Sequence, residues 1–228
     1  MNINLSISKF IKILSSVAFI LIVLSILGHI YIYKTSDDRY LVHMFDMDRE
    51  WNVPTIFSAI NLLIVGVLLQ FIATIKRQNK EPFVLHWRFL AILFLYVSFD
   101  EILVLHEQTI TPLRSLMNTS GIFYFAWTIP ASFFVVFLSV IYLKFIIKIG
   151  RPIRFLMILS AIIYISGSIG GELVSGWFLS ENNETSLLYL LITDIEESLE
   201  LTGIILFIRA LLLYIKRENN VIQFKICN

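Results

Sequence analysis

Residues 89–108 read FLAILFLYVSFDEILVLHEQ, an apolar run that ends in two acids, a histidine and a third acid. The uncharged part follows Arg88 and is typical of a helix that crosses a lipid bilayer. Ionisable side chains are costly inside a membrane, and where they occur they commonly mark functional sites. The cluster of Asp100, Glu101, His106 and Glu107 therefore predicts a site at the end of a membrane span.

The rest of the chain is similarly apolar. Of its 228 residues, 57% are hydrophobic and 15% are charged, and the mean hydropathy of +0.81 is far too high for a soluble domain of this size. The first apolar run has about 21 uncharged residues and no small-residue cleavage site, so we expect a membrane span rather than a signal peptide. The single cysteine, Cys227, argues against a disulfide framework and a cysteine metal site.

Six apolar segments predict an all-α bundle of six transmembrane helices. The connections are short and contain no linker, so we expect one domain over residues 1–228. Pro54, Pro82 and Pro152 lie at or just before span starts, where a missing backbone N–H costs nothing. Pro130 lies inside the fourth segment and is expected to kink it. The predicted spans are residues 11–33, 53–75, 84–108, 121–146, 154–178 and 187–215.

Lysine and arginine residues predict the orientation of these spans. Cytoplasmic loops carry an excess of both residues, so we expect a protein of the cell membrane with both termini in the cytoplasm. The predicted inner side collects Lys9, Lys12, Lys76, Arg77, Lys80, Arg88, Lys144, Lys148, Arg151, Arg154, Lys216 and Arg217. The predicted outer side has mainly Lys34, Arg39, Arg49 and Arg114.

The acidic residues are distributed in the opposite way, toward the outer side. They are Asp37, Asp38, Asp46, Asp48, Glu50, Asp100, Glu101, Glu107, Glu172, Asp194, Glu196, Glu197 and Glu200. With a rise of about 1.5 Å per residue from the inner basic residues, Asp100 lies roughly 18–21 Å up, Glu200 roughly 24 Å and Glu172 roughly 27 Å. His29, at roughly 25 Å, and Asn61, at roughly 22 Å, share this depth. Most of the spans therefore offer a polar group just under the outer surface of a hydrocarbon core about 30 Å thick.

Helix geometry places several of these groups on common faces. On the third span, Asp100 and Glu107 are seven residues apart and share a face that Glu101 and His106 flank. The acids of the sixth span fall within about 100° of arc. These are Glu196, Glu197 and Glu200.

Two glycines in the fifth span predict a close helix contact. Gly167 and Gly171 form a small-xxx-small pair beside Glu172. A carboxylate beside such a contact is expected to point into the bundle.

The segment RYLVHMFDMDREW, residues 39–51, alternates apolar and polar residues between the first two spans. We expect it to lie across the outer surface as an amphipathic lid, so that Asp46, Asp48 and Glu50 cover the cluster or supply ligands. The alternative is a solvated loop, a role that also suits the acids Asp37, Asp38 and Glu184.

Converging carboxylates in a poorly solvated layer must hold protons or a cation. Few outer basic residues oppose the acids, and one or two divalent ions would neutralise several carboxylates at once. Carboxylates with a few imidazoles suit Mn, Fe or Ca, and Zn less well. We expect His106 and His29 to be catalytic, as ligands or proton carriers. The expected metal ligands are Asp100, Glu101, Glu107, Glu172, Glu197 and Glu200.

The ligand types are similar to those of the ferritin-like di-iron proteins, which bind metal between helices. Those proteins pair a Glu with a His three residues later, whereas here the third span has DEILVLHE and the sixth span has no His. Membrane zinc hydrolases of the alkaline ceramidase type are also similar in burying a metal among helices. No HxxxH or HExxH motif occurs in this chain, so neither resemblance assigns a role to a residue.

Three function classes follow from this pattern. The first is a metal-dependent hydrolase or oxidoreductase acting on a lipid or another amphipathic substrate. The second is a proton- or cation-coupled transporter, although the inner half of the spans shows almost no polar lining. The third is a sensor or assembly partner with a structural ion. We expect the lipid bilayer to be the partner and no nucleic acid to bind, and the sequence leaves the oligomeric state open.

Overall fold

The computed structural model describes residues 6–37, 39–182 and 186–219, so Asp38, Glu184 and Cys227 lie outside the described residues. Every described element is helical. The α-helices are α1 (Ile7–Thr35), α2 (Tyr40–His43), α3 (Val53–Gln78), α4 (Val84–Leu103), α5 (Leu105–Met117), α6 (Thr128–Lys148), α7 (Arg151–Ile165), α8 (Glu172–Glu181) and α9 (Leu187–Asn219). A 3₁₀ turn, η1 (Gly121–Phe123), precedes α6, and a π-helical turn, η2 (Ser166–Gly171), joins α7 to α8.

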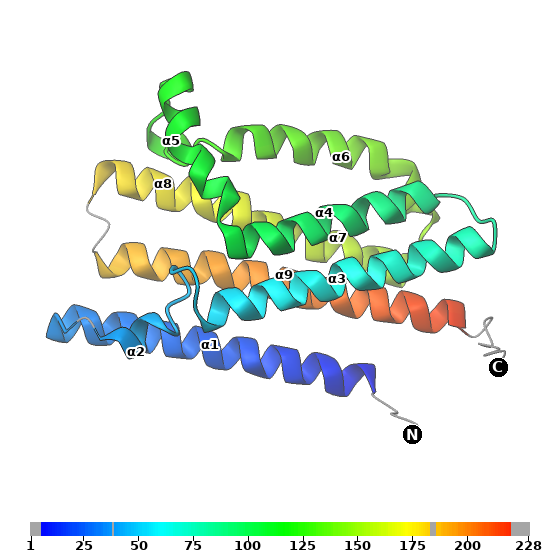
Figure 1. The fold of residues 1–228 in the computed structure, drawn as a ribbon, viewed down its shortest axis with the longest axis horizontal. Helices are drawn as coiled ribbons and strands as arrows, with labels where there is room; N and C mark the ends of the chain where they lie inside the picture. Colours follow the sequence, from blue (N-terminus) through cyan, green and yellow to red (C-terminus); the bar gives the residue numbers. More distant parts are fainter. Residues whose placement is uncertain (1–5, 38, 183–185, 220–228) are drawn as a thin grey trace.

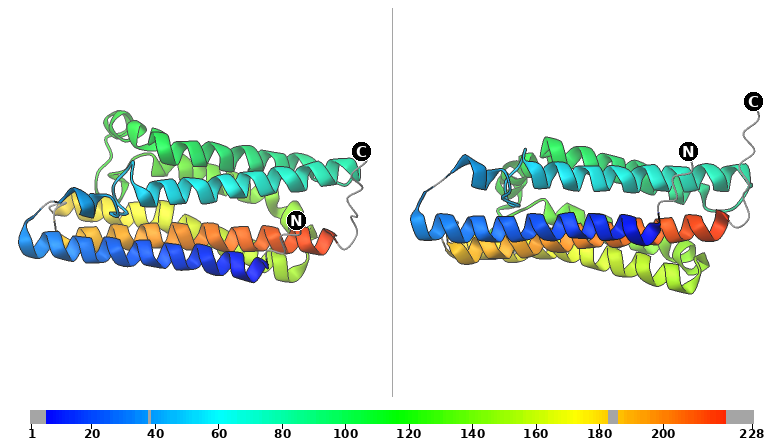
Figure 2. Two further views of the ribbon diagram at one scale, coloured as in Figure 1. Left: turned by 60° about the horizontal axis from the view of Figure 1, so that its bottom comes forward. Right: turned by 90° about the horizontal axis from the view of Figure 1, so that it is seen from below.

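The long helices run side by side along one axis, with the start of α1 and the end of α9 at the same end of the bundle (Figures 1 and 2). Helix α9 packs against α1, α3 and α7, and α3 packs against α4. Their interface is apolar and includes the fully buried residues Leu62, Val65, Leu69, Ile208 and Leu211. The core therefore lies around α3 and α9.

Among the described residues, five helical segments are long and apolar enough to cross a membrane: α1, α3, α6, the continuous run Arg151–Glu181 through α7, η2 and α8, and α9. The pair α4 and α5 counts as a sixth only if a helix bent by 81° is one span. Large apolar side chains such as Phe133, Phe137 and Val140 of α6 are exposed, as expected for a surface that faces lipid. The prediction of an all-α multi-pass membrane protein is confirmed at this level.

Two details of the predicted spans are wrong. The third span does not continue as one helix to residue 108, because α4 ends at Leu103. The fourth begins at Thr128 rather than at residue 121, so Pro130 lies in the first turn of α6. A backbone N–H in the first turn of a helix has no partner within the helix, so Pro130 is accommodated there and no interior kink results.

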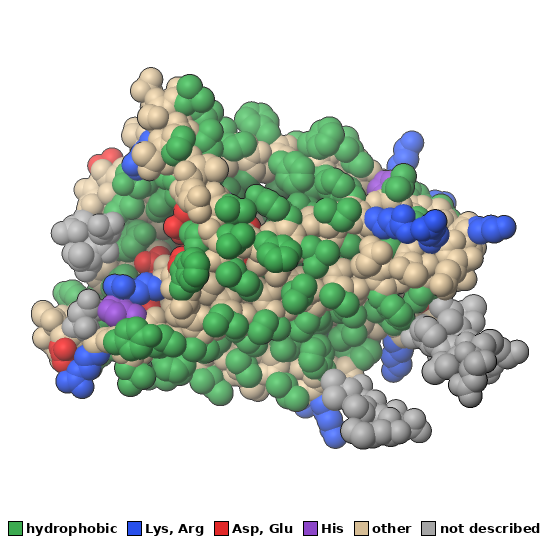
Figure 3. All heavy atoms as spheres, viewed as in Figure 1, with side chains coloured by type: hydrophobic (Ala, Val, Ile, Leu, Met, Phe, Trp, Pro, Cys, Tyr) green, Lys and Arg blue, Asp and Glu red, His purple; other side chains and the backbone are tan. Residues whose placement is uncertain are grey.

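Charge is distributed unevenly along the bundle. In the space-filling view, Lys and Arg side chains gather at the end where α9 finishes, while red carboxylates, with some Lys and Arg side chains, are visible toward the opposite end, where α4 bends into α5 (Figure 3). Apolar side chains cover the face between them. We call the two ends of the bundle the basic end and the acid end.

Candidate functional site

A sharp bend between α4 and α5 positions the first part of the site. Val104 adopts left-handed backbone angles, with φ 54° and ψ 41°. This conformation costs an L-residue about 1–2 kcal/mol, and a β-branched residue is uncommon in it. Strained backbone of this kind persists where the surroundings hold it in place and is often found at functional sites.

The Asp100 carboxylate holds the bend. Its Oδ1 accepts a hydrogen bond from the backbone N of His106 at 3.0 Å, and its Oδ2 lies 2.7 Å from Nδ1 of the same residue. One acid therefore caps the start of α5 and orients the imidazole ring. Because the chain turns by 81° at Val104, the expected common face of Asp100 and Glu107 on one helix is wrong.

A tryptophan connects His106 with Glu172. The rings of His106 and Trp127 lie 4.9 Å apart between centroids, and Trp127 Nε1 donates a hydrogen bond of 3.3 Å to Glu172 Oε1. The second oxygen, Glu172 Oε2, is buried and has no hydrogen-bond partner among the described residues. A buried carboxylate oxygen that accepts no hydrogen bond indicates that a proton or a bound ligand satisfies it.

Two glycines bring α9 close to the π-helical turn. A Cβ added at Gly171 would lie 2.5 Å from Cγ of Glu196, and one added at Gly167 would lie 2.8 Å from Cγ of Glu200. The predicted close contact is therefore confirmed, and α9 is the helix that approaches. Ser175 Oγ also donates a hydrogen bond of 3.1 Å to Glu196 Oε2. π-Helical turns within α-helices are frequently found at functional sites.

Two other acids of α9, Glu197 and Glu200, lie near Glu101 of α4. Glu200 repels Glu101 electrostatically and accepts a hydrogen bond from the hydroxyl of Tyr164. Glu197 repels Glu200 and Glu101. Glu101 in turn accepts a hydrogen bond from Ser58. These like charges are close enough to act on one another across the bundle.

The loop before α3 adds two more carboxyls to the group. Many protein atoms surround Asp48 although solvent reaches it, and this partial burial, with repulsion from Asp46, raises the pKa of Asp48 to about 6. Burial, followed by repulsion from Glu101 and Glu107, raises the pKa of Glu50 to about 7. Both loop acids therefore belong to the same electrostatic group as the acids of the helices.

We call this group the acid layer. It consists of His106 and the carboxyls of Asp48, Glu50, Asp100, Glu101, Glu107, Glu172, Glu196, Glu197 and Glu200. The predicted ligands all lie in it, with Glu107 exposed at the start of α5. Among the described residues, however, no group of three or more His, Cys, Asp or Glu side chains has the arrangement of a metal site.

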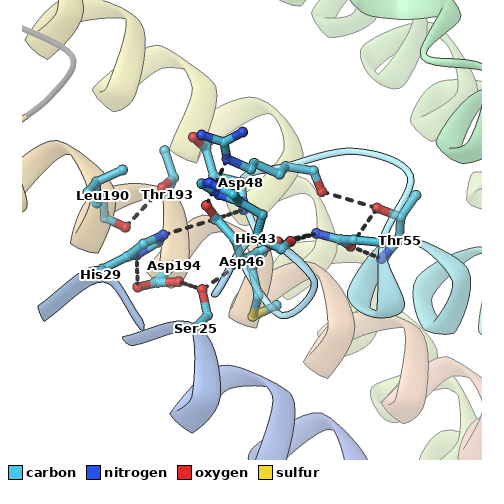
Figure 4. Close-up of polar contacts among 12 residues, drawn as sticks. Ser25, His29, His43, Asp46, Asp48, Thr55, Leu190, Thr193 and Asp194 are labelled. Atoms are coloured by element: carbon cyan, nitrogen blue, oxygen red, sulfur yellow. Dashed lines mark hydrogen bonds and ion pairs between the residues drawn. The ribbon is translucent and has the colours of Figure 1, made fainter. Parts of the chain in front are cut away.

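His29 lies outside the acid layer. Its Nε2 is 2.9 Å from Asp46 Oδ1 and its Nδ1 is 2.9 Å from Asp194 Oδ2 (Figure 4). Ser25 Oγ completes the arrangement with a hydrogen bond of 2.6 Å to Asp194 Oδ1. Both ring nitrogens of His29 are engaged, which leaves neither for a metal while these contacts hold.

Sequence reasoning missed Trp127, Tyr164 and Ser58 as partners of the acids. Each contacts a residue distant in the sequence, and no local pattern marks Tyr164 or Ser58. Trp127 alone carries a signal, since an aromatic with an N–H near a span end commonly marks a membrane interface.

A family model described as "Domain of unknown function (DUF8692)" matches residues 17–215. No curated protein and no solved structure matches the chain.

Proposed function

The chain belongs to the DUF8692 family, a domain of unknown function, and from its acid layer we propose a metal-dependent membrane enzyme that acts on a lipid or another amphipathic substrate. The observation that carries this proposal is the excess of carboxyls at the acid end. A bound divalent ion would relieve the repulsion among these carboxyls, because it neutralises several carboxylates and takes their oxygens as ligands.

Three of the four basic residues near the acid end are engaged elsewhere. Arg39 pairs with Asp37 at 2.7 Å, and Arg49 lies 3.3 Å from Asp46. The guanidinium of Arg114 lies 4.2 Å from the ring centroid of Tyr124. The fourth, Lys34, is exposed in the last turn of α1. Compensation of the acid layer therefore falls mainly to His106, to protons and to bound cations.

Two buried oxygens support a ligand in this region. Glu172 Oε2 has no partner among the described residues, and the same holds for Oδ1 of Asn61, a residue with no exposed surface. Asn61 lies one turn after Ser58, the residue that hydrogen-bonds to Glu101. Carboxylate and amide oxygens are ligands that hard divalent cations prefer.

In this proposal the metal is held by carboxylates of Asp100, Glu101, Glu107, Glu172, Glu197 and Glu200. An ion bound there would supply an activated water or a polarised substrate oxygen. His106 is oriented by Asp100 and packs on Trp127, so its remaining nitrogen, Nε2, is the one able to move a proton. Apolar helices surround the acid end, which suits a substrate delivered by the bilayer.

Elemental analysis of the purified protein in detergent tests the proposal. We expect about one or two equivalents of Mn, Fe, Ca or Zn in the wild type, by analogy with mononuclear and dinuclear sites. The double variant Asp100→Asn/Glu200→Gln should lose the metal. Asp37→Asn is the matched control, because Asp37 is an acid at the same end that pairs with Arg39 outside the layer. Normal metal content in the double variant would disprove the ligand assignment.

A proton- or cation-coupled transporter is the second candidate. It is favoured by the lack of a converging ligand group among the described residues and by the raised pKa values of Asp48 and Glu50. Carboxyls that hold protons near neutral pH suit proton exchange. Absence of metal from the wild type in the same analysis would favour this candidate over the enzyme.

A further inference from the structure

A buried hydrogen-bonded chain ties the loop before α3 to the bundle. Residues 44–52, here called the site loop, pass over the acid end, and Asp46 in the middle of this loop reaches His29 of α1. His29 in turn reaches Asp194 of α9, which accepts from Ser25 of α1. We call Ser25, His29, Asp46 and Asp194 the clamp.

The clamp is shielded from solvent. The residues are exposed by 2% (Ser25), 1% (His29), 4% (Asp46) and 1% (Asp194). A carboxylate stands at each ring nitrogen of His29, so either both nitrogens carry a proton or one carboxyl does. Buried hydrogen bonds between ionised groups are short and strong, and they fix geometry more firmly than neutral ones.

Asp46 also organises the site loop from within. Its Oδ1 accepts a hydrogen bond of 3.1 Å from the backbone N of Asp48, and its backbone O accepts one of 2.6 Å from Asn52 Nδ2. The backbone N of Met47 donates to Ser25 Oγ at 3.0 Å. Asn52 caps α3 by accepting from the backbone N of Thr55 at 3.1 Å. The loop is thus held in its middle by the clamp and at its end by α3.

The fixed loop presents its acids to the acid layer. Asp48 follows Asp46 by two residues, and its backbone N is bound to the clamp itself. The electrostatic partners of Asp48 include Glu107, and those of Glu50 include Glu101 and Glu107. The loop carboxyls therefore act on the carboxyls of α4 and α5.

We propose that the clamp positions the site loop so that Asp48 and Glu50 complete the cation site of the acid layer, with His29 as a positioning residue. This inference rests on the proposed function. It adds two ligands from outside the membrane spans, and it gives His29 a role that needs no contact with the metal. The buried, unpartnered Glu172 Oε2 independently supports a ligand at this place.

The test uses the full chain in detergent and Mn²⁺ as the probe. Asp48→Asn/Glu50→Gln removes the loop charges and keeps the clamp, so it should weaken Mn²⁺ binding at least tenfold and leave hydrogen exchange of residues 44–52 unchanged. His29→Asn should speed exchange of that segment and weaken binding by a similar factor. Asp37→Asn should change neither quantity.

A mutant cycle separates positioning from general destabilisation. If His29 acts through the site loop, adding His29→Asn to Asp48→Asn/Glu50→Gln should cause no further loss of Mn²⁺ affinity. Additive losses would overturn the inference. Should His29→Asn not fold, Ser25→Ala replaces it, because Ser25 binds both Met47 and Asp194.

The outcomes distinguish the two proposals. Mn²⁺ binding that is lost in Asp100→Asn/Glu200→Gln and retained in Asp48→Asn/Glu50→Gln would overturn this inference and leave the proposed function standing. Unchanged exchange of residues 44–52 in both His29→Asn and Ser25→Ala would overturn the clamp. A wild-type protein that binds no Mn²⁺ and contains no other metal would overturn both proposals.

Discussion

Glu50 behaves as an interior carboxyl although it belongs to a loop. Burial and the neighbouring acids Glu101 and Glu107 raise its pKa to about 7, from the ordinary value of 4.5. Asp37, at the same end of the bundle, has the opposite behaviour, because its hydrogen bond to Arg39 lowers its pKa. Two carboxyls at the same end of the bundle thus differ, because Glu50 lies among other acids and Asp37 lies beside a cation.

This difference predicts a pH dependence of stability. Between pH 4.5 and 7 the folded protein keeps a proton on Glu50 that the unfolded chain has released, so Glu50 lowers the free energy of unfolding as pH rises through this window. Its penalty is fully present above pH 7. We expect Glu50→Gln to raise the melting temperature at pH 8 and to have little effect near pH 4.5, measured in detergent with a chelator.

Asp37→Asn provides the comparison for that experiment. The lowered pKa of Asp37 means that its stabilising contribution is present above the unfolded pKa and is lost as pH falls, so this variant should not gain stability at pH 8. A melting profile of Glu50→Gln that parallels the wild type from pH 4.5 to 8 would contradict the assignment of Glu50 to the acid layer.

At this scale the sequence predicts residue types better than residue partners. The acids of the layer could be found because charge interrupts an apolar pattern and a helix rises by a constant amount per residue. The partners of His29 could not, because Asp46 and Asp194 are separated from it by 17 and 165 positions in the chain. No periodicity links positions so far apart.

The contact between α9 and the π-helical turn is the main structural feature at the scale of elements. It depends on glycine, since the acids of α9 occupy the space in which side chains at 167 and 171 would lie. Gly170 differs, because a Cβ added there would meet only Ile165 O, at 3.9 Å. Substitution of Gly171 therefore tests the close contact, and substitution of Gly170, in the same turn, is its control.

We predict that Gly171→Ala separates α9 from η2 and destabilises the protein by about 1–3 kcal/mol, the usual cost of overpacking. Glu196 would move with α9, so cation binding should weaken as well. Gly170→Ala should leave both properties near wild type. Thermal unfolding in detergent and Mn²⁺ titration give the two quantities, and equal effects of the two variants would contradict a specific close contact.

The long helices were predictable because their hydropathy determines them. Features that depend on a single residue, such as a bend or the exact start of a helix, were not. The apolar segments located the long helices, and Gly167 with Gly171 predicted a close approach that exists. The bend at Val104 was not predictable, because a β-branched residue disfavours left-handed angles and only the capping by Asp100 explains it. The wrong kink at Pro130 came from placing the helix start several residues too early.

The whole molecule has a strong polarity, with basic residues at one end and the acid layer at the other. This polarity predicts that both termini and the basic end face the cytoplasm. In a Cys227→Ser background, Asp37→Cys should react with a membrane-impermeant thiol reagent in intact cells, and Lys80→Cys should react only after lysis. The reverse labelling pattern would invert the orientation and place the acid layer on the cytoplasmic side.

The clamp also has a consequence for biosynthesis. It joins the first long helix to the last, because Ser25 and His29 of α1 need Asp194 of α9. During translation Asp46 follows His29 closely, but the ribosome makes Asp194 only much later, so a nascent chain has just one of the two carboxyl partners of this imidazole. Only the arrival of α9 completes the clamp, so residues 44–52 reach their final position only after the last long helix has been made.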